Sequence, residues 1–99
     1  MNQDELVALK ILCTHYEVDM SFFSRLHELD LIEIYTEKQV DYVHRDKVGD
    51  IERMIRLHME LDINHEGIDT IFNLLDKIDR LESEVTSMRN KLRRYEEDL

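Results

Sequence analysis

Few residues in this chain have the types and spacing that metal binding or catalysis requires. Cys13 is the only cysteine, so no Cys-x-x-Cys pair is present, and its apolar neighbours predict a core position. The five histidines are scattered. His58 and Asp62, four residues apart, could share a metal on one helix face, but no His-Glu-x-x-His spacing and no glycine-rich phosphate loop appear. We therefore expect no metal, no cofactor and no enzymatic activity.

Charge is the more informative property of the chain. The 23 acidic residues outnumber the 13 basic ones and give a formal net charge of -10, a sign that repels the phosphate backbone of nucleic acids. Residues 20–44 hold two basic side chains, Arg25 and Lys38, among five acidic ones. Nucleic acid is therefore not the expected partner, and a basic partner fits better.

Length and composition predict one small domain that is mostly helical. The chain has 99 residues, no proline and only two glycines, and its apolar residues recur with helical period. Its first residues lack the pattern of a signal peptide, and no apolar run is long enough to span a membrane. A cytoplasmic protein without membrane contact is the expectation.

The elements that carry the charged residues follow the order of a winged helix-turn-helix. A strand is predicted at Val7-Ala8, followed by helices over residues 9–16 and 20–29 that are joined by a three-residue turn. Asp19 can cap the second of these helices. The spacing of a buried helix face is shown by Phe22, Phe23, Leu26 and Leu29.

A hairpin and a third helix are expected next. β-Branched and aromatic residues predict strands at 31–35 and 40–43, on either side of a polar stretch at 36–39, as the wing. The third helix is predicted over 46–61 with Asp46 near its start. Its inward residues are expected to be Val48, Ile51, Ile55 and either His58 or Met59.

The sequence Asp62-Ile63-Asn64 then interrupts the helical pattern, and Asn64 is a good cap for the next helix. Gly67 lies in the first turn of that helix. We expect this glycine to allow close packing against the third helix, since a lone glycine does not make a phosphate site.

One long C-terminal helix is predicted from His65, because no stop signal follows. Its apolar residues form two registers, of which the first is Ile68, Ile71, Leu75 and Ile78. The second has the alternating four-three spacing of a heptad seam and comprises Leu81, Val85, Met88, Leu92, Tyr95 and Leu99. Flanking charges of alternating sign favour a parallel or an offset antiparallel pair. We expect a homodimer through Leu81, Val85, Met88, Leu92 and Tyr95; the alternative is that the helix folds back on its own domain.

The arrangement of these segments resembles the MerR superfamily and, more closely, the CbpM chaperone-modulator family. Asp30-Leu31-Ile32 stands where Gly-Leu-Ile is usual, and the most specific stretch is RLHMELDINHEGIDTIFNLLDKIDRLE. The resemblance covers about residues 13–95. It implies a mainly α, MerR-like winged helix-turn-helix with a small hairpin wing over residues 1–62. Residues 63–99 are then a C-terminal helical segment packed on it within a single structural domain.

The resemblance also implies a partner. Members of the CbpM family bind the J-domain of a DnaJ-like co-chaperone and block its stimulation of a DnaK-type ATPase. Because the J-domain face that engages the ATPase is basic, an acidic patch would select it. We expect this partner-binding patch at Glu17, Asp19, Glu28 and Asp30; the alternative is that these carboxylates are only solvated surface.

Two other functions remain open at this stage. Compared with DNA-binding MerR regulators, the chain has Ser24-Arg25-Leu26 where an Arg-Tyr-Tyr is usual and lacks the Gly-Tyr-Arg of the wing. A MerR-like transcriptional regulator would therefore need a positive face made by Arg45, Lys47, Arg53 and Arg56. A structural adaptor would pair only through the heptad seam.

Overall fold

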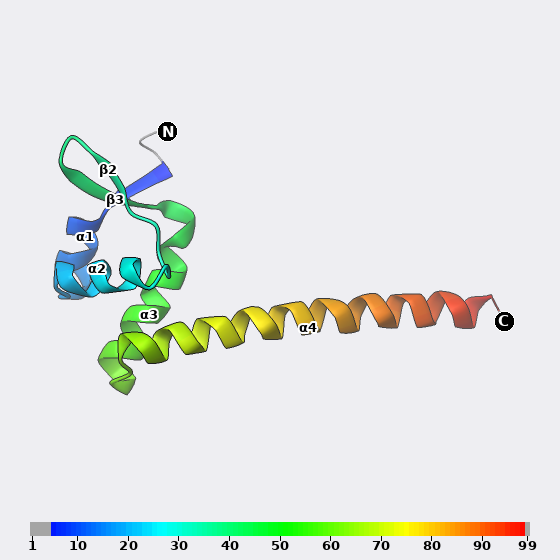
Figure 1. Ribbon diagram of the computed structural model, residues 1–99. Coiled ribbons are helices and arrows are strands. Elements are labelled where there is room, and N and C mark those ends of the chain that lie inside the picture. Colours follow the sequence, from blue (N-terminus) through cyan, green and yellow to red (C-terminus); the bar gives the residue numbers. More distant parts are fainter. Residues whose placement is uncertain (1–4, 99) are drawn as a thin grey trace. The chain divides into compact units, whose positions relative to one another are not determined.

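The computed structural model describes residues 5–98 and confirms a mainly α winged helix (Figure 1). Leu99, the last residue of the predicted seam, lies outside the described residues. The strands and helices, in chain order, are β1 (Leu6–Ala8), α1 (Leu9–Tyr16), α2 (Met20–Glu28), β2 (Tyr35–Glu37), β3 (Val40–His44), α3 (Val48–Leu61) and α4 (His65–Glu97).

The chain forms two compact units, which divide between Asp69 and Thr70 within α4. The first unit contains the sheet, α1, α2, α3 and the first turn of α4, and the second contains the rest of α4. The predicted division into a winged helix-turn-helix region over 1–62 and a C-terminal helical segment over 63–99, packed together in one domain, stays a prediction. No helix among the described residues is long and apolar enough to cross a membrane.

The helix-turn-helix was predicted well. α1 has the predicted bounds, and α2 ends at Glu28, one residue early. The predicted inward residues of α2 are buried except Leu29, which is half-buried at the helix end. Asp19 occupies the N-cap, but its side chain makes no capping hydrogen bond. Instead its carbonyl oxygen accepts from the Phe22 N–H at 3.0 Å.

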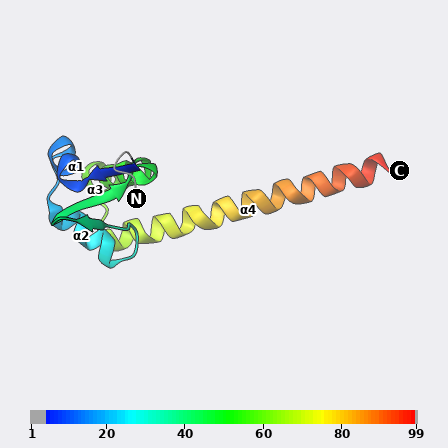
Figure 2. The same cartoon turned by 90° about the horizontal axis from the view of Figure 1, so that it is seen from above.

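The wing is a β-hairpin, as predicted, but its first strand begins later than expected. β2 and β1 both pair antiparallel with β3, in the order β1-β3-β2 (Figure 2 shows this layer from above). The connection between β2 and β3 is only Lys38 and Gln39, both with positive φ, and such a two-residue turn fixes the register so that Tyr35 pairs with Tyr42. Thr36 and Glu37 therefore belong to a strand, whereas residues 31–34 do not.

The backbone N–H groups of Asp30 and Leu31 cap the C-terminal end of α2. Asp30 has a φ of 59°, its N–H donates to the His27 carbonyl at 3.0 Å, and the Leu31 N–H donates to the Leu26 carbonyl at 3.0 Å. This pair of bonds is the Schellman motif, whose left-handed residue is usually glycine. Position 30 therefore requires a positive φ, which agrees with the glycine that the resemblance leads one to expect there.

α3 begins two residues later than predicted, after a 3-10 turn over Arg45–Lys47. The Asp46 N–H donates to His44 Nδ1 at 3.2 Å in this turn. Of the two alternatives for the last inward position, Met59 is exposed and His58 is half-buried, so His58 is the inward residue. Met54, which the sequence analysis missed, is buried.

The turn between α3 and α4 has the predicted break and cap. Asn64 Oδ1 accepts from the Gly67 N–H at 2.8 Å. A Cβ on Gly67 would lie 2.6 Å from Cγ2 of Ile63 and 3.1 Å from Asn64 Oδ1. The prediction that Gly67 packs closely against the third helix is therefore wrong, because its close contacts are with Ile63 and Asn64 of the turn.

The two glycines provide a matched pair of stability variants. We expect Gly67→Ala to lower the free energy of unfolding by about 1–3 kcal/mol, because the methyl group of Ile63 is fixed by β-branching and cannot move aside easily. Gly49→Ala should raise it by about 0.5–1 kcal/mol, since α3 has open space there and alanine is the better helix former. Urea unfolding of both variants measures the difference; equal shifts would contradict the close contact at Ile63.

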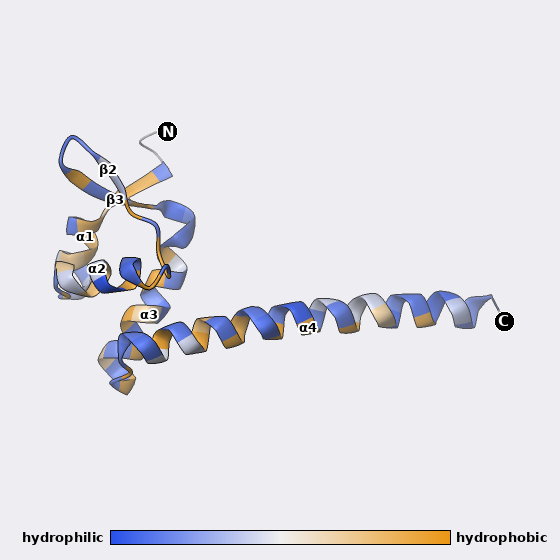
Figure 3. Ribbon diagram, viewed as in Figure 1, coloured by the Kyte–Doolittle hydropathy of each residue, from blue (hydrophilic) through white to orange (hydrophobic). Residues whose placement is uncertain are grey.

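Both predicted registers of α4 are present, but they divide differently from the prediction. Ile68 is buried and Ile71 and Leu75 are half-buried, whereas Ile78 belongs with the exposed residues of the second register. Leu74 and Ile78 are exposed, and they continue the four-three spacing of the later residues backwards along the helix. Figure 3 shows hydrophobic positions recurring along α4. We call this set the α4 seam: Leu74, Ile78, Leu81, Val85, Met88, Leu92 and Tyr95.

Candidate protein-binding site

The four acidic residues predicted to bind a partner lie in two pairs at the two ends of α2. Asp19 is the N-cap and Glu17 precedes it by two residues, whereas Glu28 is the last helical residue and Asp30 follows it. All four are exposed. Nine helical residues separate the pairs by about 14 Å along the axis. One patch was predicted, whereas these residues form two acidic pairs, one at each end of α2.

The only arginine of α2 is held by two carboxylates. Arg25 Nη1 lies 3.0 Å from Glu28 Oε2, and Nη2 donates to Glu66 in the first turn of α4. The hydrogen bond from Arg25 lowers the pKa of Glu66, and the same bond raises the pKa of Arg25. The positive charge of Arg25 is therefore balanced by two neighbouring carboxylates.

The wing also presents acids. Tyr35 donates to Glu33 at 2.7 Å, and Thr36 donates to Asp41 at 2.7 Å. Lys38, in the turn, is the only lysine or arginine among residues 31–44. The hairpin therefore lacks the basic character that contact with phosphate requires.

The basic residues of α3 and its leading turn do not form a purely positive surface. Arg45, Lys47, Arg53 and Arg56 are exposed. Residues 45–60 hold these four basic side chains and four acidic ones, Asp46, Asp50, Glu52 and Glu60. This balance removes most of the electrostatic attraction that a DNA-binding face needs.

Asp30 carries a conformational cost at the end of α2. We expect Asp30→Gly to raise the free energy of unfolding by about 1 kcal/mol, because glycine adopts positive φ freely. Asp30→Asn removes the same charge and keeps a side chain, and should change stability less. Chemical unfolding of wild type, Asp30→Gly and Asp30→Asn separates the effect of positive φ from the effect of the lost charge. A destabilised Asp30→Gly would contradict the assignment of the Schellman motif.

Cys13 has no sign of reactivity. It is half-buried, which corrects the predicted core position. Burial first and the nearby charge of Asp19 second raise the pKa of its thiol, so the thiolate needed for nucleophilic or metal chemistry is disfavoured. Among residues 5–98 no group of three or more potential metal ligands comes together.

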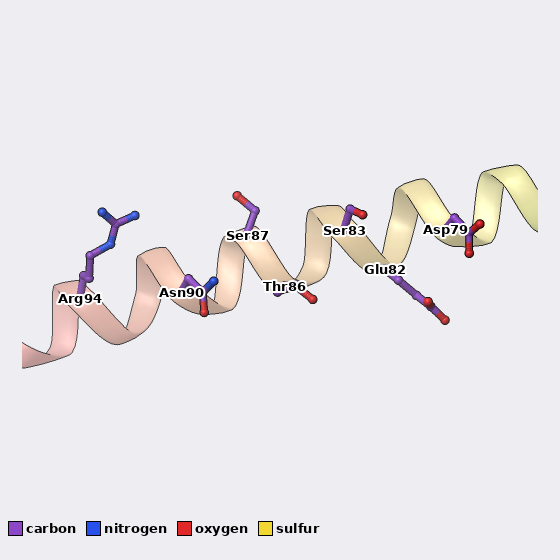
Figure 4. Close-up of a pocket in the computed structure, with 7 residues that line it drawn as sticks. All are labelled: Asp79, Glu82, Ser83, Thr86, Ser87, Asn90 and Arg94. Atoms are coloured by element: carbon purple, nitrogen blue, oxygen red, sulfur yellow. The ribbon is translucent and has the colours of Figure 1, made fainter. Parts of the chain in front are cut away.

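The polar face of α4 offers no enclosed cavity. Figure 4 shows side chains that project from successive turns of this one helix. They are Asp79, Glu82, Ser83, Thr86, Ser87, Asn90 and Arg94. An open face of this kind cannot surround a small molecule.

The α4 seam is the largest set of exposed apolar side chains on one element of the described chain. Its members are between 46% and 69% exposed. Ile78, Leu81 and Val85 line an apolar groove together with Glu82, Thr86 and Arg89. Leu74 was not predicted as part of the seam, although it lies four residues before Ile78 and seven before Leu81, which is heptad spacing.

Fold and surfaces together define a winged helix-turn-helix protein with acidic residues at both ends of its second helix and an exposed apolar face on α4. The family model described as MerR HTH family regulatory protein matches residues 7–90, and the chain belongs to this family. It is also 24% identical over 88 residues to the chaperone modulatory protein CbpM of Pseudomonas entomophila (strain L48), which covers 88% of this chain and 87% of the relative. The predicted resemblance to the CbpM and MerR-like families is thereby confirmed. No solved structure matches significantly.

Proposed function

We propose that this protein is a chaperone modulator that binds the J-domain of a DnaJ-like co-chaperone and inhibits its stimulation of a DnaK-type ATPase. The similarity to a chaperone modulatory protein over most of both chains supports this function. The structural observation that carries it is the second helix, where Arg25 is neutralised by Glu28 and Glu66. A helix-turn-helix with this charge suits a basic protein surface better than DNA.

Inhibition is steric and electrostatic and involves no chemistry. The acidic pairs at the two ends of α2, Glu17 with Asp19 and Glu28 with Asp30, attract the basic face of the J-domain. Exposed charges of this kind mainly accelerate encounter. Once bound, the protein covers the face that the ATPase chaperone must contact.

An ATPase assay tests this function. With a DnaK-type chaperone and its J-protein, added chain should return the stimulated rate to the basal rate and leave the basal rate itself unchanged. The J-protein must be the limiting component, so that inhibition follows its occupancy. A stimulated rate that stays constant at saturating chain would contradict the proposal.

A second function, as a DNA-binding regulator, is favoured by the family match itself. It would rely on Arg45, Lys47, Arg53 and Arg56, whose charge the neighbouring acids balance. A salt-dependent complex with duplex DNA, lost on replacing Arg53 and Arg56, would support this function over J-domain binding.

We also propose that the α4 seam pairs two copies of the chain. Seven exposed apolar residues at heptad spacing extend over more than three heptads, the length at which coiled coils become stable. The covering partner is a second copy because the flanking charges are self-complementary. They are Lys77, Glu82, Glu84, Arg89, Lys91 and Glu96.

Two registers bring opposite charges together. A parallel in-register pair sets Lys77 against Glu82 of the second copy and repeats this pattern in the next heptads. An antiparallel pair centred between residues 86 and 87 sets Glu82 against Arg89 and Glu84 against Lys91. Extending the seam to Leu74 therefore strengthens the prediction of a homodimer and leaves both orientations that the sequence favoured.

A further inference from the structure

Three aromatic rings from three helices form a tilted cluster where α3 turns into α4. The ring centroid of Phe22, on α2, lies 5.0 Å from that of His58, on α3, and 5.0 Å from that of His65, the first residue of α4. The two imidazole centroids are 5.5 Å apart. All three residues belong to the first compact unit. Neither the acidic surface nor the α4 seam uses these histidines.

The imidazole of His65 is placed where a positive charge is unfavourable. The buried Nε2 of His65 has no hydrogen-bond partner among the described residues. His65 also begins a long helix, where the helix dipole opposes a cation. His58 Nδ1 lies 3.0 Å from the carbonyl oxygen of Ile63 and is thereby tied to the turn. Burial first and His58 second lower the pKa of His65.

The charged groups around the pair do not reverse this preference. Arg25, on α2, adds a positive charge, whereas the adjacent Glu66 adds a negative one that Arg25 already pairs. Asp62 follows His58 by four residues, and Asp69 follows His65 by four. Glu66 and a hydrogen bond with the Phe22 backbone act to raise the pKa of His65, but desolvation and the other imidazole outweigh them, so this pKa lies below its ordinary value.

We propose that the cluster of Phe22, His58 and His65 is an acid-sensitive clasp, which holds the α3–α4 turn while both imidazoles are neutral and loosens when they are protonated. Two like charges at this separation, beside Arg25, repel one another and lose the hydration that they have in the unfolded chain. The proposal goes beyond J-domain binding and does not depend on it.

The direction of the pH effect follows from the lowered pKa. An unfolded histidine takes up its proton near pH 6.5, whereas folded His65 resists protonation to a lower pH. Below about pH 6.5 the unfolded chain therefore binds more protons than the folded chain, and stability falls. General charge repulsion acts in the opposite direction, because acid reduces the net charge of -10.

The test is the thermal midpoint Tm of the full chain at about pH 7.5 and about pH 5.5, at one protein concentration and one ionic strength. The chains compared are wild type, His65→Phe, His58→Phe and the control His15→Gln, whose ring is exposed on α1. Wild type and control should lose about 4 °C or more on acidification, and each phenylalanine variant should lose half of that or less.

Titration of the histidine ring protons by NMR gives a second readout that needs no variant to fold. His65 should titrate below its ordinary value of about 6.5. The clasp is overturned if His65 titrates at or above that value, or if His65→Phe and His15→Gln show equal changes of Tm on acidification. Should His65→Phe not fold, His65→Gln replaces it, with the same outcomes required.

Discussion

Val85→Asp is expected to convert a homodimer into a monomer, with the largest effect of any single substitution considered. Val85 is near the middle of the α4 seam, so a dimer would bury two new carboxylates at this position, where removing each from water costs several kcal/mol. The dissociation constant should rise by about 1,000-fold or more. Sedimentation equilibrium over a concentration series measures it directly.

The matched control is Ser87→Asp, which adds the same charge two residues away on the polar face of α4. This variant should remain dimeric, since its carboxylate stays in water in either orientation of the pair. Both variants should keep the helical circular dichroism of the first unit. A wild-type chain that is monomeric at all accessible concentrations, or equal weakening by both substitutions, would exclude the seam as the interface.

Charge reversal at both ends of α2 is expected to have the second-largest effect. The variant carries Asp19→Lys and Glu28→Lys, one residue from each acidic pair. Both side chains are exposed, and Asp19 makes no side-chain capping bond, so folding should tolerate the changes. Association with the J-domain should slow by about tenfold or more at low salt, with a much smaller change in the dissociation rate. Stopped-flow binding measures both rates.

A control variant with the same change in net charge shows whether the position of the charges or only their sum controls association. Asp76→Lys with Glu97→Lys adds the same positive charge to α4 and should slow association only slightly. The single variants Asp19→Lys and Glu28→Lys show whether the J-domain reaches one or both ends of α2. Equal slowing by the α2 and α4 variants would place the binding face elsewhere.

Much of the first unit could be predicted because its signals are local. The bounds of α1, the turn before α2 and the cap at Asn64 follow from short-range spacing and from side chains that bond to nearby backbone groups. The start of β2 was wrong because the left-handed pair at Lys38 and Gln39 lacks the glycine that usually announces such a turn.

The candidate site was less predictable because it depends on contacts between distant residues. Arg25 and Glu66 are 41 residues apart, and no local pattern connects them. The same holds for the cluster of Phe22, His58 and His65, which come from three different helices. The four acidic residues were identified by type, and the predicted bounds of the second helix, nearly the same as those of α2, already separate them into two pairs.

The start of the α4 seam was missed although the sequence contains the signal for it. The four-three spacing continues back to Leu74, but Leu75 fits a second helical face equally well in a helix read alone. Exposure decides between them, since Leu74 is exposed and Leu75 is half-buried. Burial is a property of the folded chain, which periodicity alone does not give.

The most direct test of the proposed function is a calorimetric titration of the full chain with the isolated J-domains of the DnaJ-like proteins from its own organism, at low and at physiological salt. Saturable binding to one of them, which weakens as salt rises, is the predicted result because acidic and basic surfaces attract most strongly at low ionic strength. The absence of binding heat with every J-domain at both salt concentrations, confirmed at a second temperature, would contradict the proposed function.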